Sequence, residues 1–179
     1  MKRDSLLALL RSYQPLNEEE NQMYVDTIAF VENNEDCFER TLLEGHVTAS
    51  GWVLSADRLS ILLMHHFKLN QWFQPGGHCD GDPDVEAVAR KEVWEETGIN
   101  DLILAKPGIY DVDVHLIPAN KALPAHLHYD IRFAFVAPEN AQIVINSESR
   151  DVQWIPIPEV AAFNNSESIM RMVRKTSSL

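Results

Sequence analysis

The distribution of apolar and polar residues divides the chain into an N-terminal helical part and a longer part in which strands alternate with helices. Helices are predicted over residues 3–13 and about 17–33, and Asn17 suits the N-cap of the second because three glutamates follow it directly. From about Gly45 the pattern changes to short runs that are typical of strands. The remaining elements are predicted as strands at 46–54 and 60–66 and near 101–115, 127–136 and 143–155, with helices near 157–163 and 165–175.

A turn-rich segment and one further helix stand between these strands. Residues 74–82 are rich in Gly, Pro and Asp, which favours turns. The helix that follows is predicted to begin with Asp82 as its cap and Pro83 at the first helical position, and Gly98 ends it. Strands around a central helix, with helices at both ends of the chain, predict an α+β fold arranged as a helix–sheet–helix sandwich.

Length and charge narrow the functional classes. A chain of 179 residues fits one domain with a single core. A net charge of −12 argues against a nucleic-acid polymer as the partner, because phosphate contacts need clustered Lys and Arg. Small phosphorylated ligands stay open, since a divalent metal can supply the positive charge that the protein lacks.

Three features bear on the compartment. The apolar stretch at residues 5–10 is short and Arg11 interrupts it, so an amphipathic helix is expected there rather than a signal peptide. No apolar run reaches the about 20 residues of a membrane helix, so no membrane association is expected. The two cysteines, Cys37 and Cys79, give no disulfide framework and favour a reducing cytosol, so a cytoplasmic protein is predicted.

The central helix carries three carboxylates on one face. Glu92, Glu95 and Glu96 stand at positions i, i+3 and i+4 and repel one another by roughly a few tenths of a kcal/mol per pair. A solvated surface would explain such a face, but the Gly-Gly turn before the helix lets backbone approach a ligand closely. The opposite face would anchor the helix to a sheet through Val85, Val88, Ala89 and Val93. Carboxylates held in this way suit Mg²⁺ or Mn²⁺.

The residues from Gly77 to Ile99 resemble the Nudix box. That box reads Gly, five residues, Glu, seven residues, Arg-Glu-aliphatic-x-Glu-Glu-x-Gly-aliphatic, and the spacing here matches throughout. The detailed match covers about residues 72–99, and the strand order is compatible with the family over roughly 45–165. The resemblance implies a Nudix-type three-layer α/β/α sandwich with a mixed central sheet at residues 41–179, preceded by an N-terminal helical extension at 1–40 in one structural unit.

Two positions depart from the family pattern. Pro83 stands where the family has its first Glu, and Lys91 stands where it has Arg. In the family these two side chains are understood to pair, so both members differ together here. Asp82 or Asp84 could take over as the partner of Lys91, which would donate as a point charge without the fork of Arg.

The resemblance also implies roles for individual residues. Glu92, Glu95 and Glu96, with the backbone carbonyl of Gly76, would hold Mg²⁺ or Mn²⁺. One of these glutamates, or Glu148 from a distant loop, would activate the attacking water, although a solvated loop acid explains Glu148 equally well. The residues expected to contact substrate are Gly76, Gly77, Lys91, Trp72 and Tyr129.

The seven histidines suggest a second site. Because successive strand residues face opposite sides, His126, His128 and Asp130 share one face. The chain also resembles isopentenyl-diphosphate isomerase, which has a Nudix-like fold and a metal held by histidines and glutamates; one of its His ligands stands six residues before a strand Trp, as His46 does before Trp52. A second metal site for a transition metal is therefore hypothesised at His46, His78, His128 and Asp130.

The function predicted is that of a metal-dependent hydrolase, a pyrophosphohydrolase that cleaves a diphosphate linkage in a nucleoside diphosphate derivative or similar small molecule. An isomerase of allylic diphosphates is a second hypothesis, disfavoured because Gly76 occupies the position of that family's catalytic Cys. A catalytically weak Nudix-like ligand-binding module is a third, which the departures at Pro83 and Lys91 allow. The sequence leaves the oligomeric state open, and the N-terminal helices could pack against a second subunit in a homodimer.

Overall fold

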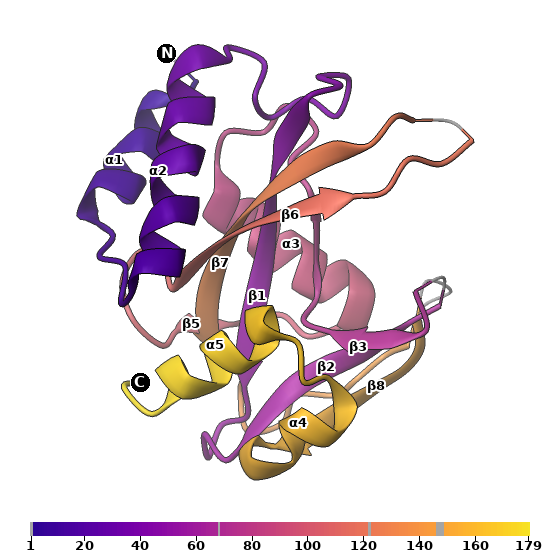
Figure 1. Ribbon diagram of the computed structural model, residues 1–179. Coiled ribbons are helices and arrows are strands. Elements are labelled where there is room, and N and C mark those ends of the chain that lie inside the picture. Colours follow the sequence, from indigo (N-terminus) through magenta and orange to yellow (C-terminus); the bar gives the residue numbers. More distant parts are fainter. Residues whose placement is uncertain (1, 68, 122, 146–148) are drawn as a thin grey trace. The chain divides into compact units, whose positions relative to one another are not determined.

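The computed structural model of the protein describes residues 2–67, 69–121, 123–145 and 149–179. Helices stand at both ends of the chain and one long helix, α3, interrupts the strands (Figure 1). The elements are α1 (Asp4–Ser12), α2 (Glu18–Asn33), β1 (Gly45–Leu54), β2 (Ser60–His66), β3 (Gln71–Phe73), β4 (Gly76–His78), α3 (Val85–Thr97), β5 (Ile103–Leu104), β6 (Asp111–Ile117), β7 (His126–Val136), β8 (Ser149–Pro156), the 3-10 helix η1 (Ile157–Glu159), α4 (Val160–Phe163) and α5 (Glu167–Thr176).

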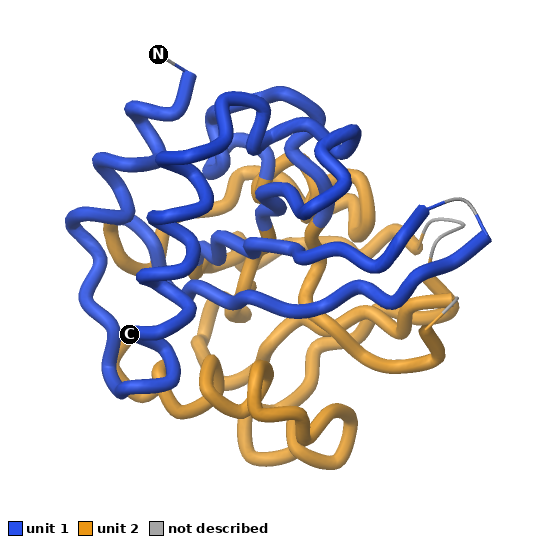
Figure 2. Tube along the Cα trace, turned by 45° about the horizontal axis from the view of Figure 1, so that its top comes forward, with its two compact units in different colours: residues 1–49, 77–88, 108–133 blue, residues 50–76, 89–107, 134–179 orange. Residues whose placement is uncertain are grey.

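The strands form one hydrogen-bonded sheet. Its main order is β3-β2-β1-β7-β5, and β4 pairs with β1, β6 with β7 and β8 with β2. The chain divides into two compact units, one of residues 1–49, 77–88 and 108–133 and the other of residues 50–76, 89–107 and 134–179 (Figure 2). We call them unit 1 and unit 2 and describe each by itself.

In unit 1, helix α2 covers the hairpin of β6 and β7. The ring of Phe30 on α2 stacks on Tyr129 of β7 with centroids 4.0 Å apart and planes 8° apart. Asn17 accepts a hydrogen bond from the backbone N–H of Glu20, so the predicted N-cap of this helix is confirmed. Helix α1 is tied to α2 by Arg3, whose guanidinium donates to the carbonyls of Val31 and Glu32.

In unit 2, two neighbouring residues of β1 show that helices cover both faces of the strand. The indole N–H of Trp52 donates to the Thr176 hydroxyl of α5 over 2.9 Å. A Cβ added at Gly51 would instead lie 2.6 Å from the Val93 Cγ2 of α3. Since consecutive strand residues point to opposite faces, α5 and α3 lie on opposite sides of β1. The helix–sheet–helix layering predicted from the sequence is confirmed here.

Helix α3 starts two residues later than the sequence predicts. Asp84, and not Asp82, is its cap, because the Asp84 carboxylate accepts from the Ala87 N–H over 3.1 Å. Asp82 accepts from the Asp84 N–H instead, so this short turn places Pro83 before the helix. The predicted end is confirmed: Gly98 adopts a φ of +74° and its N–H donates to the Trp94 carbonyl.

Other boundaries differ where glycine or proline breaks a strand pattern. The strand predicted near 101–115 is two separate strands, β5 and β6, because Gly108 between them has a φ of +76°. In the strand predicted near 143–155, residues 143–145 are not in a strand, and β8 is described over Ser149–Pro156. Part of the expected turn at 74–82 forms strand β4. Within the described ranges, no helix is both long enough and apolar enough to cross a membrane.

The close approach of α3 to β1 gives a prediction about stability. Gly51→Ala should lower the free energy of unfolding by about 1–3 kcal/mol, because the new Cβ would press on Val93 and on the Phe135 ring. Urea unfolding of the two proteins measures the difference. The double variant Gly51→Ala/Val93→Ala should lose less stability than the sum of the single variants. An unchanged unfolding midpoint in Gly51→Ala would contradict this packing.

Candidate functional site

The three glutamates of α3 lie in unit 2 together with Gly76. Glu96 is 7% exposed, and its Oε2 accepts a hydrogen bond from the Gly76 N–H over 2.9 Å. The side chains of Glu92 and Glu95 are 15% and 43% exposed, so exposure to solvent increases from Glu96 to Glu92 to Glu95. The hydrogen bond joins the helix to the start of the Gly-Gly turn, two segments that the sequence separates by twenty residues.

Lys91 contacts this glutamate face. Its Nζ lies 3.3 Å from Glu95 and 3.8 Å from Glu92. The sequence suggested Asp82 or Asp84 as its partner, but those carboxylates accept backbone N–H groups of the turn and the first helical residues. Three carboxylates on one helical face, with one ammonium beside them, suit a divalent cation.

The packing beneath the helix explains why the face is held in place. The four residues predicted for the opposite side of α3 are buried. At the C-terminal end, the Thr97 hydroxyl donates to the Val93 carbonyl and its own carbonyl accepts from the Val144 N–H. The donor set of carboxylate and backbone oxygens is the kind that Mg²⁺ and Mn²⁺ prefer, so these residues fit the metal that the sequence predicts.

The other residues predicted to contact substrate lie in different surroundings. Trp72 stacks on His65, with centroids 5.2 Å apart, and meets the edge of Phe163. Tyr129 is 8% exposed and its ring packs on α2, where burial raises the pKa of its hydroxyl. Gly77 lies in strand β4. Glu148 lies outside the described residues.

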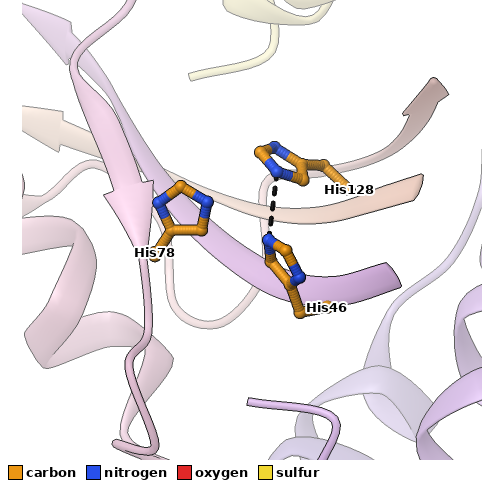
Figure 3. A group of neighbouring side chains, drawn as sticks. All are labelled: His46, His78 and His128. Atoms are coloured by element: carbon orange, nitrogen blue, oxygen red, sulfur yellow. Dashed lines mark hydrogen bonds between the residues drawn. The ribbon is translucent and has the colours of Figure 1, made fainter. Parts of the chain in front are cut away.

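Unit 1 brings His46, His78 and His128 together, and we call these three residues the histidine cluster. They come from β1, β4 and β7, and their rings face one another (Figure 3). One nitrogen from each ring lies within 4.8 Å of the others. The Nε2 atoms of His46 and His128 are 3.1 Å apart.

Burial keeps these imidazoles neutral at pH 7. It lowers the pKa of His46 to about 4, and the nearby imidazole of His78 adds to the effect. The pKa of His128 falls to about 2, again mainly through burial and then through its histidine neighbours. Burial lowers the pKa of His78 as well. A neutral imidazole offers a nitrogen lone pair, which is the form that binds metal.

Asp130, the fourth residue predicted for this site, belongs to a buried ion cluster instead. Its two oxygens accept from the Thr48 hydroxyl over 3.0 Å and from the Arg132 Nε over 2.8 Å. Arg132 is 3% exposed and also lies 3.1 Å from both Asp111 and Asp113. Burial alone would lower the pKa of Arg132, but Asp113, Asp130 and Asp111 together raise it, so the guanidinium stays charged.

The register of the β6–β7 hairpin explains this arrangement. Asp111, Asp113 and His115 on β6 stand opposite Arg132, Asp130 and His128 on β7. Asp113 also lies 3.1 Å from Arg132, which is diagonally across the strand pair, and 2.9 Å from the Nδ1 of His115 on its own strand. The alternation of Asp111, Asp113 and His115 in the sequence is the signal that could have revealed these partners.

Comparison with known proteins agrees with this architecture. The family model described as NUDIX domain matches residues 45–175. The structure of the Ap4A hydrolase of C. elegans is similar with a TM-score of 0.55 and 17% identity, over 74% of this chain and 96% of that one. The dihydroneopterin triphosphate pyrophosphohydrolase of E. coli gives 0.58 and 18%, over 72% and 92%.

A third similar structure is the MutT protein of Methanosarcina mazei Go1, with a TM-score of 0.58 and 14% identity, over 76% of this chain and 96% of that chain. No curated protein matches the sequence. At these identities the structural likeness establishes the fold, and the α+β fold of Nudix type predicted from the sequence is confirmed. Helices α1 and α2 lie outside the matched residues.

The buried ion cluster gives a second prediction. Arg132→Met should destabilise the protein by about 3–5 kcal/mol, because three buried carboxylates would lose their cation. Urea unfolding at pH 7 measures the loss. Arg174→Met is the matched control, since it removes an arginine whose ion pair with Glu167 is half exposed, and its effect should be far smaller. Equal effects of the two substitutions would argue against the cluster's importance.

Proposed function

This chain belongs to the NUDIX family of hydrolases, and we propose that it cleaves a diphosphate linkage in a nucleoside diphosphate derivative or similar small molecule with the help of Mg²⁺ or Mn²⁺. The observation that carries the proposal is the glutamate face of α3, where Glu96 bonds to the Gly76 N–H and Lys91 lies beside Glu95. The carboxylates stand on a helix whose opposite face is buried, next to a glycine turn, which suits a site that must bind charge in a fixed geometry.

Glu92, Glu95 and Glu96, together with the Gly76 carbonyl, are the residues we propose as metal ligands. The metal would neutralise phosphate oxygens and stabilise the departing phosphate. Glu96 is the most constrained of the three, because burial and the Gly76 N–H fix its carboxylate. Glu95 is the most exposed and is therefore best placed to accept a proton from water. Glu148 stays an alternative base.

The departures at positions 83 and 91 are compatible with this function. Lys91 already has carboxylates of its own helix within ion-pair distance, so it does not depend on an acid at position 83. Pro83 precedes the helix, where its missing N–H costs nothing. Both changes therefore leave the glutamate face intact.

For the substrate we propose a small molecule and not a nucleic-acid polymer, in keeping with the net charge of −12. The similar structures include enzymes named for Ap4A and dihydroneopterin triphosphate, which supports a nucleotide or pterin di- or triphosphate as the substrate class. Of the residues predicted to meet substrate, we retain Gly76, Gly77, Lys91 and Trp72. The free, buried thiols of Cys37 and Cys79 support a cytoplasmic location.

The proposal predicts hydrolysis that depends on both metal and the glutamates. Phosphate or nucleotide release from a panel of nucleoside diphosphate derivatives and triphosphates should require Mg²⁺ or Mn²⁺ and stop in chelator. Glu95→Gln and Glu96→Gln should each lower kcat on the order of 100-fold or more, because a ligand or proton acceptor is lost.

Glu86→Gln is the control, since this acid lies on the same helix six residues before Glu92 and outside the glutamate face. It should keep activity close to that of the unaltered enzyme. Full activity in chelator, or in both glutamate variants, would refute the metal mechanism. Tight ligand binding without turnover of any diphosphate would favour a binding module.

A further inference from the structure

We propose that the histidine cluster binds one first-row transition metal ion, best matched by Zn²⁺, through the imidazoles of His46, His78 and His128 alone. This site uses other ligands than the glutamate face, and it does not depend on the proposed function. It also differs from the site hypothesised from the sequence, because Asp130 is not among its ligands.

The spacing of the ring nitrogens is the first argument. Zinc binds imidazole nitrogen at about 2.0–2.1 Å, which puts two nitrogens on a tetrahedral ion roughly 3.3–3.4 Å apart and on neighbouring octahedral positions roughly 2.9 Å apart. The Nε2 atoms of His46 and His128 are separated by 3.1 Å, which falls between these values. The two nitrogens therefore already stand at the separation of two ligands of one ion.

The third ring completes a triangle. The ring centroids of the three histidines are 4.9, 4.8 and 5.0 Å apart in the pairs His46–His78, His46–His128 and His78–His128. Near-equal separations are what three rings around one central ion produce. The ring of His78 points toward the other two (Figure 3), and its nitrogen is within 4.8 Å of theirs. A small rotation of this partly exposed side chain would bring it into the coordination sphere.

The hydrogen bond between His46 and His128 joins only two of the three rings. Two neutral imidazoles whose Nε2 atoms face each other share one hydrogen bond at most, because one nitrogen must donate and the other accept. A metal ion accepts a lone pair from each of the three rings at once. A cation would therefore engage all three rings, whereas this hydrogen bond engages two.

The nature of the ligands decides the metal. Imidazole suits Zn²⁺, Cu²⁺, Ni²⁺ and Fe²⁺, whereas Mg²⁺ prefers oxygen. Asp130, the oxygen ligand that the sequence suggested, is held by Thr48 and Arg132. Three imidazoles leave the fourth position of a tetrahedral ion open to water or to a group of a bound molecule, as in zinc sites that carry three histidines.

Two further histidines support the cluster from outside. His126 lies 5.0 Å from His46 between ring centroids, and its Nδ1 is 2.9 Å from the Pro124 carbonyl. His115 lies 5.5 Å from His128, and its Nδ1 is 2.9 Å from Asp113. Acceptors at Nδ1 fix each ring's orientation, which keeps the surroundings of the site ordered.

The test is a titration of the metal-free protein with Co²⁺ in a large excess of Mg²⁺. Visible absorption monitors the binding of Co²⁺, and Zn²⁺ is then added as a competitor. The wild type should bind one equivalent that Mg²⁺ does not displace and Zn²⁺ does. His78→Gln and His128→Gln should each weaken binding at least about tenfold, since even indirect supporting residues contribute that much.

Two control variants test whether Co²⁺ binding depends on the histidine cluster alone. His65→Gln removes a histidine that stacks on Trp72 in unit 2, and it should bind Co²⁺ as the wild type does. Glu95→Gln should also keep the Co²⁺ site, while it loses the proposed hydrolysis. Circular dichroism of each variant checks that it is folded. His78→Gln is the variant expected to disturb folding least, because His78 is only partly buried.

Absence of Mg²⁺-resistant Co²⁺ binding in the wild type, or equal affinity in folded His78→Gln, His128→Gln and His65→Gln, would overturn the proposal. Failure of diphosphate hydrolysis alongside histidine-dependent Co²⁺ binding would refute the proposed function and leave this inference standing.

Discussion

Helix α3 approaches strand β1 at a point where only glycine fits, because a Cβ at Gly51 would come 2.6 Å from the Val93 side chain. This contact fixes the distance between helix and strand, so the buried residues of α3 set the orientation of the whole helix. The opposite face of that helix then presents Glu92, Glu95 and Glu96 together. The hydrogen bond from Gly76 to Glu96 adds a second attachment at the glycine turn. The glutamate face is thus held by the packing beneath it and by the hydrogen bond from Gly76 beside it.

The glutamate face and the histidine cluster differ in the chemistry of their ligands. The first offers carboxylate and backbone oxygen, graded from the buried Glu96 to the half-exposed Glu95, and suits a hard dication. The second offers imidazole nitrogen from rings that burial keeps neutral, and suits a softer transition metal. Because the two ligand sets prefer different ions, each can be tested without loading the other.

Asp130 and His128 lie on the same face of β7 but have different partners. Asp130 belongs to the ion cluster around Arg132, and His128 belongs to the histidine cluster. A guanidinium that is almost wholly buried needs nearby carboxylates, and Asp111, Asp113 and Asp130 supply them. These ion pairs join Arg132 of β7 to Asp111 and Asp113 of β6, within the strand pair that also carries His128. Asp113 also contacts the Nδ1 of His115, so this histidine is linked to the ion cluster.

The sequence by itself determined the features that depend on local periodicity and backbone chemistry. The spacing of Glu92, Glu95 and Glu96 sets one helical face, Asn17 caps α2, and Gly98 ends α3, because each follows from interactions within a few residues. Local interactions did not determine every detail: Asp84 caps α3 although Asp82 was predicted to do so. Both aspartates accept a nearby backbone N–H, and only the bond to Asp84 comes from within the helix. The tertiary structure alone decided which residues meet between elements: Asp130 of β7 with Thr48 of β1, Arg132 of β7 with Asp111 of β6, and Tyr129 of β7 with Phe30 of α2. Alternation along a strand shows which residues share a face, but the register of the neighbouring strand decides what stands opposite them.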